Sequence, residues 1–524
     1  MLGVRRAGCS TGRAFGPYCV AMTANQPNIL FIQVDQQAAS FLGAYGNTVA
    51  KTPHMDELAS KSVVFDSAYT NFALCAPSRF SMMSGRLASE VGAYDNGAEF
   101  PSSIPTYAHY LKASGYHTAL AGKMHFVGAD QLHGFDERLT IDIYPASFQW
   151  TGDWNEVVQQ HSNDARSFTL AGPITRNVQL DYDEEVLHRA ERKLYDLARG
   201  IGIEADQPWH LTVSFTHPHD PYQCSHEHWN RYRHDEIDMP EVGMLEDMDP
   251  YSVRLRREYG LADVEITEEQ IRTARHGYYG SVSYVDDLVG SLLRTLATTG
   301  LDSNTVVVFS TDHGDMMGER GLWYKRSFFE GSSRIPLMVS WPSRFEPSRV
   351  TANVSLVDLL PTYLDLAASD IEPVDPMAGS SLVPLCDDPT ASSADLVFGE
   401  NLSEGATAPI LMVKRGSLKY VWSGCDPAQL FDLGADPNEL VNLAGTSDYE
   451  SEQSELHAIT QRRWDVETLA TKVVESQRRR AFLRSLYAGG NAPEWRTAPP
   501  DQASQLVLAE GETYNNWAYD NILA

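Results

Sequence analysis

The sequence lacks several features, and each absence excludes a class of protein. No apolar run approaches the roughly 20 residues that a transmembrane helix requires, so we predict no membrane span. The six cysteines are scattered at positions 9, 19, 75, 224, 386 and 425 with no Cys-x-x-Cys pair, which indicates unpaired thiols and a reducing compartment. Basic residues number 41 against 70 acidic ones, and the net charge of −29 argues against binding to nucleic acid or to anionic membranes.

The length and composition describe a large globular protein. At 524 residues, of which 43% are hydrophobic and 21% charged, the chain is long enough for several domains. Arg5, Arg6 and Arg13 are basic, but the apolar segment of about 7 to 15 residues that follows in a signal peptide is absent. We therefore predict a cytoplasmic protein in which residues 1–24 are a leader or disordered, with Met22 as an alternative start.

Apolar runs alternate with helical patterns through the first 370 residues. We expect buried strands at 27–34, 115–121, 209–216 and 305–311. We expect helices at 52–62, 104–114 and 266–298, the last of them broken at 277–280. This alternation predicts an α/β fold in which a mostly parallel sheet is sandwiched between helices.

A shift in composition marks the end of this alternation. Between 370 and 393 the chain is rich in Pro, Asp, Ser and Ala, which suggests a domain boundary. Short antiparallel strands at 410–413 and 418–422, a turn at 429–437 and one amphipathic helix at 456–486 are expected after it. We predict a main domain at 25–385, a smaller C-terminal α+β domain at 386–488 and a C-terminal tail at 489–524.

Polar side chains stand at the carboxyl ends of the four expected strands, where ligands bind in a parallel sheet. The strands are followed in turn by Asp35, by Lys123 and His125, by His217 and His219, and by Asp312 and His313, and Lys325 adds a cation further on. One such residue is readily explained as a helix cap or a structural histidine, but four strand ends of this kind indicate a functional site. Because the chain is so acidic, a site for an anion needs local positive charge from a metal or from Lys and Arg.

The most informative segment is Cys75-Ala76-Pro77-Ser78-Arg79. Taken alone, its Cys is equally well explained as a small buried apolar residue near a turn. Together with other motifs, however, the segment resembles the signature of the type I sulfatases of the alkaline-phosphatase superfamily. The resemblance runs from 27 to about 442 and includes Pro-Asn-Ile-Leu-Phe at 27–31, Gly-Lys-Met-His at 122–125, Asp-His-Gly at 312–314 and Leu-Phe-Asp-Leu at 430–433. Within the family, the segments at 75–81, 92–96, 122–128, 216–222 and 318–325 are most similar to choline sulfatases.

The resemblance implies an alkaline-phosphatase-like fold and a sulfate ester hydrolase with a modified nucleophile. A formylglycine-generating enzyme would oxidise Cys75 to formylglycine, whose aldehyde hydrates to a diol. One hydroxyl attacks the sulfate sulfur, and deprotonation of the other re-forms the aldehyde as inorganic sulfate leaves. The resemblance also implies that Arg79 holds the diol or the metal ligands, and that Lys123 and Lys325 bind the sulfate oxygens.

A base, an acid and a metal site are implied as well. His125 is the expected base on the diol and His219 the expected acid to the leaving alcohol, with His217 as a second choice. The expected metal ligands are Asp35, Asp312, His313 and the modified residue at Cys75. Gln36, where many sulfatases have a second Asp, is not included. The carboxylates favour calcium, while His313 leaves manganese and magnesium open.

Recognition of choline requires aromatic faces and carboxylates, because a quaternary ammonium donates no hydrogen bonds. Trp150 matches the choline-sulfatase pattern, and Glu400 matches a carboxylate in it, whereas the segment 154–171 departs from it. In choline sulfatases a C-terminal extension helps to build oligomers, so we expect a homo-oligomer, either a dimer or a tetramer. In that role the tail offers Tyr514, Trp517, Tyr519 and Asp520.

Three hypotheses about function follow. The first is hydrolysis of choline sulfate or a related small sulfate monoester. The second is an arylsulfatase, or a promiscuous phosphonate monoester or phosphodiester hydrolase, because the same groups suit either anion. The third is a binding protein with an inactive site, against which the complete set of Cys, Arg, Lys and His residues argues.

Overall fold

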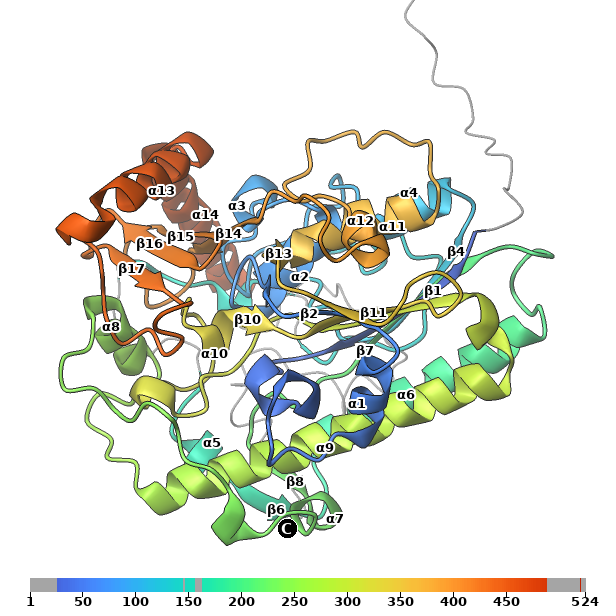
Figure 1. Ribbon diagram of the computed structural model, residues 1–524, viewed down its shortest axis with the longest axis horizontal. Helices are drawn as coiled ribbons and strands as arrows, with labels where there is room; N and C mark the ends of the chain where they lie inside the picture. The colour runs from blue at the N-terminus through green and yellow to red at the C-terminus, as the bar shows by residue number, and fades with distance from the viewer. Residues whose placement is uncertain (1–25, 145–146, 156–162, 488–518, 520–524) are drawn as a thin grey trace, which may run out of the picture.

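The computed structural model describes residues 26–144, 147–155, 163–487 and 519 (Figure 1). The predicted leader at 1–24 and, apart from residue 519, the predicted tail at 489–524 lie outside the described residues. In the described part, a large sheet with helices on both faces forms the centre, and a smaller sheet lies beside it (Figure 1). The predicted α/β architecture is confirmed.

Four parallel strands form the middle of the eight-stranded sheet. In spatial order they are β9 (Thr305–Thr311), β1 (Asn28–Val34), β7 (Trp209–Ser214) and β4 (His117–Gly122). Nearly all their residues are buried, since helices cover both faces, and this explains why their sequences are continuous apolar runs. The register pairs Val34 with Thr311 and Gly122 with Ser214, so the residues that follow these strands leave the sheet at one edge.

Antiparallel pairing is confined to one side of the large sheet. On that side β11 lies antiparallel between β9 and β2, and β12 pairs in parallel with β2. At the opposite edge of the sheet, β5 pairs in parallel with β4. Two smaller sheets have the orders β10-β3-β13 and β6-β8. The bounds are β2 Val63–Phe65, β3 Ala68–Tyr69, β5 Glu137–Arg138, β6 Gly172–Ile174, β8 Gln223–Ser225, β10 Arg334–Ile335, β11 Leu337–Ser340, β12 Ser348–Val350 and β13 Val354–Ser355.

The two faces of the large sheet are covered by different helices. In Figure 1, α1 (Pro53–Ala59), α6 (Val178–Ala198) and α9 (Glu268–Thr298) lie below the sheet, and α2 (Cys75–Ser84), α4 (Tyr107–Ala113) and α11 (Leu359–Leu366) lie above it. The helices predicted at 52–62 and 104–114 correspond to α1 and α4, each somewhat shorter than expected. A helix that begins at Cys75 places the most informative segment of the sequence at a helix N-terminus.

The predicted break at 277–280 is wrong, because α9 is continuous through these residues. Its glycines serve close packing: a Cβ at Gly277 would lie 2.1 Å from the Tyr222 carbonyl oxygen, and one at Gly280 would lie 2.2 Å from the Cys224 sulfur. Two glycines one turn apart therefore let β8 lie directly against α9. The cost of glycine in a helix, about 1 kcal/mol each relative to alanine, is offset by this contact.

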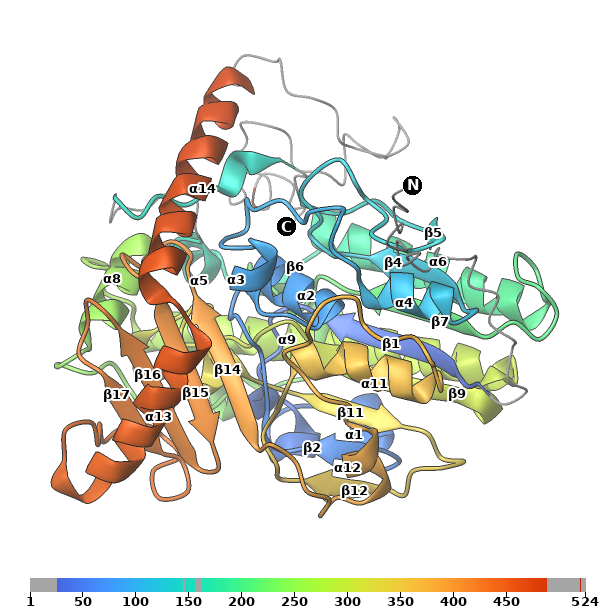
Figure 2. The same ribbon diagram turned by 90° about the horizontal axis from the view of Figure 1, so that it is seen from above.

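The C-terminal part forms an antiparallel sheet covered by helices. The predicted pair of antiparallel strands is confirmed as β15 and β16, but residues predicted as a turn supply a further strand, β17. The single helix predicted at 456–486 is two helices, since Asp465 accepts the N–H of Thr468 and starts a new helix there. The bounds are β14 Leu396–Asn401, β15 Ile410–Arg415, β16 Leu418–Ser423, β17 Gln429–Asp432, α13 Glu450–Arg463 and α14 Val466–Tyr487. Figure 2 shows α14 extending away from this sheet.

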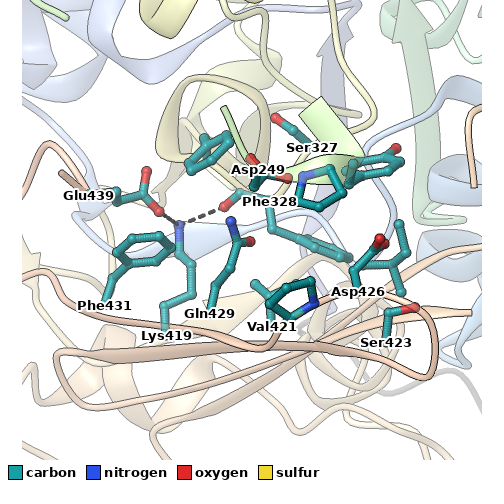
Figure 3. A pocket seen from close by; sticks show the side chains of 15 residues that line it. Asp249, Ser327, Phe328, Lys419, Val421, Ser423, Asp426, Gln429, Phe431 and Glu439 are labelled. Carbon is teal, nitrogen blue, oxygen red and sulfur yellow. Dashed lines mark hydrogen bonds and ion pairs between the residues drawn. The ribbon is translucent and has the colours of Figure 1, made fainter. Parts of the chain in front are cut away.

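A buried lysine joins the small sheet to the segment 328–330. Lys419 of β16 donates to the carbonyl of Phe328 at 2.7 Å, to Glu330 at 2.6 Å and to Glu439 at 2.9 Å. Figure 3 shows its ammonium between Glu439 and Phe328 at one side of a pocket lined by β15, β16 and β17 and by residues 249–251 and 327–329. Because Phe328 lies three residues after Lys325, this contact ties the small sheet to a segment of the predicted site.

Two predictions, the lack of a membrane span and the unpaired cysteines, concern features that the described residues show. Among them, no helix is both long and apolar enough to cross a bilayer. The four cysteines that the structure describes, namely Cys75, Cys224, Cys386 and Cys425, are unpaired. The thiol prediction thus holds for these four.

The close contact at Gly277 yields a stability prediction. Gly277→Ala places a methyl group against the Tyr222 carbonyl, and overpacking of this kind costs about 1–3 kcal/mol. We expect the free energy of unfolding, measured by urea titration, to fall by about that amount despite the better helix propensity of alanine. Gly243→Ala is the control, since nothing lies within 4 Å of its Cβ position. Equal stability of the two variants would contradict the packing argument.

Candidate active site

The predicted strand-end residues come together at one edge of the large sheet. Asp35 follows β1, Lys123 follows β4, His219 lies five residues after β7, and Asp312 and His313 follow β9. All five side chains are buried. The parallel register explains their convergence, since β1 pairs with both β7 and β9, and β7 with β4.

Cys75 lies at the centre of this group. Its sulfur is 3.3 Å from His313 Nε2 and 3.8 Å from Lys123 Nζ. The next residue, Ala76, donates its N–H to Asn96 Oδ1 at 3.0 Å, which fixes the start of α2. Burial raises the pKa of the Cys75 thiol to about 11. The unmodified side chain is therefore a protonated thiol at neutral pH, surrounded by polar groups and not by an apolar core.

Arg79 lies one turn further along α2 and joins the two acidic strand ends. It is fully buried, its Nη2 donates to Asp35 at 2.7 Å, and its Nε donates to Asp312 at 2.8 Å. Its Nη1 donates to the carbonyl of Lys123 at 2.5 Å and to Ser214 Oγ at 2.9 Å. One guanidinium thus connects the ends of all four central strands.

Asp35 is held as a carboxylate in spite of its burial. Burial alone would raise its pKa, but the charges of Lys123 and Arg79 hold the pKa well below its usual value. Its Oδ2 accepts from Arg79 and from Lys123, which is 2.5 Å away. Its Oδ1 is buried and accepts no hydrogen bond. A buried carboxylate oxygen without a donor is a natural ligand for a cation.

The predicted metal ligands lie close enough together to share one ion. Ligand atoms of Asp35, Cys75, Asp312 and His313 all lie within 4.8 Å of one another. His313 Nδ1 lies 3.0 Å from the Gly314 carbonyl, an arrangement that leaves Nε2 facing Cys75 as a ligand would. With the orphaned oxygen of Asp35, these residues fit a divalent cation that prefers oxygen ligands.

Gln36, which we did not include in the site, lies within it. Its Nε2 donates to Asp315 at 2.5 Å and to Asp220 at 3.3 Å, while its Oε1 accepts from Lys325 Nζ. Burial raises the pKa of both carboxyl groups. A neutral amide between two buried acids avoids a third negative charge and orients Lys325. The position of Gln36 directly after a strand-end Asp was the signal available in the sequence.

The two candidate acids differ in their surroundings. His219 Nε2 lies 2.8 Å from Lys325 Nζ, and its Nδ1 lies 2.8 Å from the carbonyl of Asp220. Burial and Lys325 lower the pKa of His219 well below its usual value. The ring of His217 instead lies 2.7 Å from Asp183 of α6. The structure thus brings His219, and not His217, next to a sulfate-binding candidate.

His125 is held in the site by its backbone. The N–H groups of Met124, His125 and Phe126 all donate to Asp142 at 2.7 to 3.3 Å, and the φ of His125 is +60°. Both ring nitrogens are buried and have no hydrogen-bond partner. Burial, with Lys123 and Arg79, lowers the pKa of this ring well below its usual value. A neutral imidazole with no partner is poised to accept a proton.

The two predicted choline-binding residues lie in different surroundings. The ring centroid of Trp150 lies 5.3 Å from that of His125 and 5.2 Å from that of Tyr144. Tyr144 in turn lies under Lys123 Nζ at 3.9 Å. The Glu400 carboxylate accepts from the N–H and hydroxyl of Ser89 and from the Trp464 indole, at 2.5 to 2.8 Å. Among the described contacts, Trp150 thus joins the cluster, whereas Glu400, on β14, is bound by Ser89 and Trp464.

Known proteins resemble this chain in sequence. It matches the family model described as Sulfatase over residues 27–369, and the model described as N-sulphoglucosamine sulphohydrolase, C-terminal, over residues 318–464. It is 43% identical over 496 residues to the choline-sulfatase of Rhizobium meliloti (strain 1021), a match that covers 93% of this chain and 96% of that protein. It is 28% identical over 449 residues to an arylsulfatase of Clostridium perfringens (strain 13 / Type A), covering 81% and 91% respectively.

Solved structures share the fold. The phosphonate monoester hydrolase of Agrobacterium radiobacter superposes with a TM-score of 0.65 at 21% identity, covering 86% of this chain and 96% of that one. The 2-O GAG sulfatase BT1596 gives 0.66 at 23% identity, covering 94% and 100%. At these identities the similarity concerns the fold alone.

The metal ligands yield a prediction about metal content. Asp312→Asn removes a charge that both Arg79 and the proposed cation require, so we expect less bound divalent metal and a lower rate together. Elemental analysis of purified protein beside activity assays measures both. Asp302→Asn, on the exposed surface, is the matched control and should keep its metal. An unchanged rate in protein shown to be metal-free would contradict the assignment.

Proposed function

The chain belongs to the sulfatase family and is a sulfuric ester hydrolase, and on that premise we propose that it cleaves a small sulfate monoester with a cationic end, such as choline sulfate. The observation that carries the proposal is the position of Trp150. Its ring lies against His125, beside a cluster of cations suited to sulfate. The 43% identity to a choline-sulfatase supports the same substrate class.

The proposed nucleophile is residue 75 after its oxidation by a formylglycine-generating enzyme. The buried thiol is protonated at neutral pH and so is a poor nucleophile as it stands. A hydrated aldehyde supplies two hydroxyl groups on one carbon. The oxygen of the first attacks sulfur as the bond from sulfur to the alcohol oxygen breaks. Loss of a proton from the second re-forms the aldehyde and releases sulfate.

Two buried lysines are proposed to hold the sulfate group. Lys123 lies beside Asp35, and Lys325 lies beside Gln36. Arg79 holds Asp35 and Asp312 in place behind them. In a buried site such fixed charges stabilise the transition state more than they would in water. They also supply the local positive charge that an acidic chain needs to attract an anion.

Two neutral histidines are proposed to transfer the protons. His219 Nδ1 is held at the Asp220 carbonyl, so Nε2 faces Lys325 Nζ and passes to the leaving alcohol the proton that Lys325 gives it. His125, whose ring nitrogens have no partner, accepts a proton from residue 75. Both side chains have lowered pKa values, so each is a neutral imidazole near pH 7 until a proton is transferred.

Asp35, Asp312, His313 and the modified residue 75 are proposed to hold one divalent cation. When bound, the cation supplies Lewis-acid activation of the nucleophile. The two carboxylates favour calcium, and the imidazole keeps manganese and magnesium as alternatives.

The cationic end of the substrate is proposed to face Trp150. A trimethylammonium group gains about 0.5 to 2 kcal/mol from an aromatic face. We retain Glu400 as a buried negative charge fixed by Ser89 and Trp464. Its effect on the ammonium would be electrostatic, because its oxygens are engaged within the protein.

An alternative activity is hydrolysis of aryl sulfates, phosphonate monoesters or phosphodiesters. The structural similarity to a phosphonate monoester hydrolase favours it as the second candidate. Both candidates use the same anion-binding groups and differ only at the other end of the substrate. A cytoplasmic location and a dimeric or tetrameric homo-oligomer remain predictions, as does the absence of a nucleic-acid or membrane partner.

The nucleophile assignment predicts a modified and essential Cys75. Mass spectrometry of the tryptic peptide should find the aldehyde in protein made together with the maturation enzyme, and Cys75→Ala should lose nearly all activity. Cys224→Ala is a matched control, because that buried thiol packs against Gly280, away from the reacting groups. Full activity of Cys75→Ala would contradict the proposed mechanism.

The substrate assignment predicts a selective effect at Trp150. Trp150→Ala should lower kcat/KM for choline sulfate roughly 2- to 30-fold, which is the loss of one cation–π contact. Glu400→Gln should act in the same direction. Neither should much affect 4-nitrophenyl sulfate, which lacks the ammonium. Equal losses on both substrates would mean that these residues support the fold. Faster turnover of the aryl sulfate or of a phosphodiester than of choline sulfate by the wild-type protein would favour the alternative activity.

A further inference from the structure

We propose that Arg480 of α14 is a positioning residue that sets the place of the Trp150 ring relative to Cys75. The inference rests on the proposed function, because it concerns the residue assigned to the cationic end of the substrate. It gives the C-terminal domain a part in substrate selection, although α14 contributes none of the predicted site residues.

Arg480 joins two segments of the main domain. Its guanidinium binds both carboxylate oxygens of Asp95, with Nη2 donating to Oδ2 at 2.8 Å. The same guanidinium donates to Thr151 Oγ1 at 3.1 Å, on the residue directly after Trp150. The two side chains of the ion pair are only 7% and 0% exposed. A buried bidentate ion pair of this kind has little freedom to adopt another geometry.

Asp95 connects this ion pair to both sides of the site. It accepts the N–H of Gly97 at 2.9 Å and that of Gly152 at 3.3 Å. Its neighbour Asn96 accepts the N–H of Ala76 at 3.0 Å, directly after Cys75. The loop that carries Trp150 and the helix that begins at Cys75 are therefore both hydrogen-bonded to residues 95–96, the segment that Arg480 holds in place.

The same face of α14 makes two further contacts with this loop. Gln477 Oε1 accepts the N–H of Trp154 at 3.1 Å, and Arg484 donates to the carbonyl of Gln149 at 3.1 Å. Residues 477, 480 and 484 are three and four apart, so they lie on one side of the helix. They contact the loop before and after Trp150. Figure 2 shows α14 lying beside this part of the main domain.

A ring displaced by about 1 Å loses much of its contact with a bound cation, because both the contact distance and the orientation matter. The anion end of the substrate is held by groups on the large sheet that Arg480 does not touch. Loss of Arg480 should therefore weaken turnover of a cationic sulfate ester more than turnover of an aryl sulfate.

The test compares Arg480→Gln with Arg478→Gln, a matched change on the exposed side of the same helix. We expect Arg480→Gln to lower kcat/KM for choline sulfate by roughly 3- to 30-fold, no more than Trp150→Ala does, and to change 4-nitrophenyl sulfate turnover less than about 3-fold. Arg478→Gln should match wild type on both substrates. Equal losses in the two arginine variants, or equal losses on both substrates, would overturn the proposal.

A double-mutant cycle separates positioning from general support of the fold. If Arg480 acts through Trp150, Arg480→Gln should cost less than about 3-fold on choline sulfate once Trp150 is already Ala. A full, additive loss in that background would rule the mechanism out. If Arg480→Gln fails to fold, Arg484→Gln, at a half-buried position near the end of α14, replaces it. This variant should also lower kcat/KM for choline sulfate more than for 4-nitrophenyl sulfate, but by a smaller factor.

A spectroscopic readout keeps this test independent of the substrate assignment. In protein labelled with 5-fluorotryptophan, the fluorine resonance that Trp150→Phe removes belongs to Trp150. Arg480→Gln should shift or broaden that resonance, and Arg478→Gln should leave it in place. If wild type fails to cleave choline sulfate, the proposed function falls, while an unmoved resonance would by itself overturn the role of Arg480.

Discussion

The site depends on one buried guanidinium. Arg79 pairs with Asp35 and Asp312, which end two neighbouring parallel strands, and it also holds the backbone after a third. Without it, Asp312 would lose its buried guanidinium partner and Asp35 one of its two cationic partners, and breaking a buried pair costs about 3–5 kcal/mol. The acidic pair could then be compensated only by Lys123 and a cation. Because Arg79 and Cys75 lie on the same helix, the residue that holds the acids also fixes the position of Cys75 beside them.

Neutral groups complete the arrangement as much as charged ones do. Gln36 stands between Asp220 and Asp315 and accepts from Lys325, so this buried lysine is held without adding another negative charge. His125 and His219 have lowered pKa values because they are buried beside lysines. Positive charge in the site therefore comes from Lys and Arg, and the imidazoles stay available for proton transfer.

The smaller C-terminal sheet contributes to this site indirectly. Lys419 holds the carbonyl of Phe328, three residues beyond Lys325, and α14 contacts the loop that carries Trp150. Both contacts join parts of the chain that are about 90 to more than 300 residues apart. Asp35, Lys123 and Asp312 thus lie at the ends of the central strands, whereas Trp150 lies on a loop that the C-terminal part supports.

The sequence by itself determined the central strands and the meeting of Asp35, Lys123 and Asp312 where they end, because a buried strand is a continuous apolar run and its polar residues gather where the run ends. It failed where packing overrides local pattern: 277–280 stays helical because two glycines admit β8, and 429–432 pairs as a strand because β16 offers an edge. Only the tertiary structure decided that His219 and not His217 meets Lys325, that Gln36 joins the site, and that Ser89 and Trp464 engage Glu400. These outcomes depend on partners distant in the chain, and hydrogen-bond geometry between such partners leaves no periodic trace in a sequence.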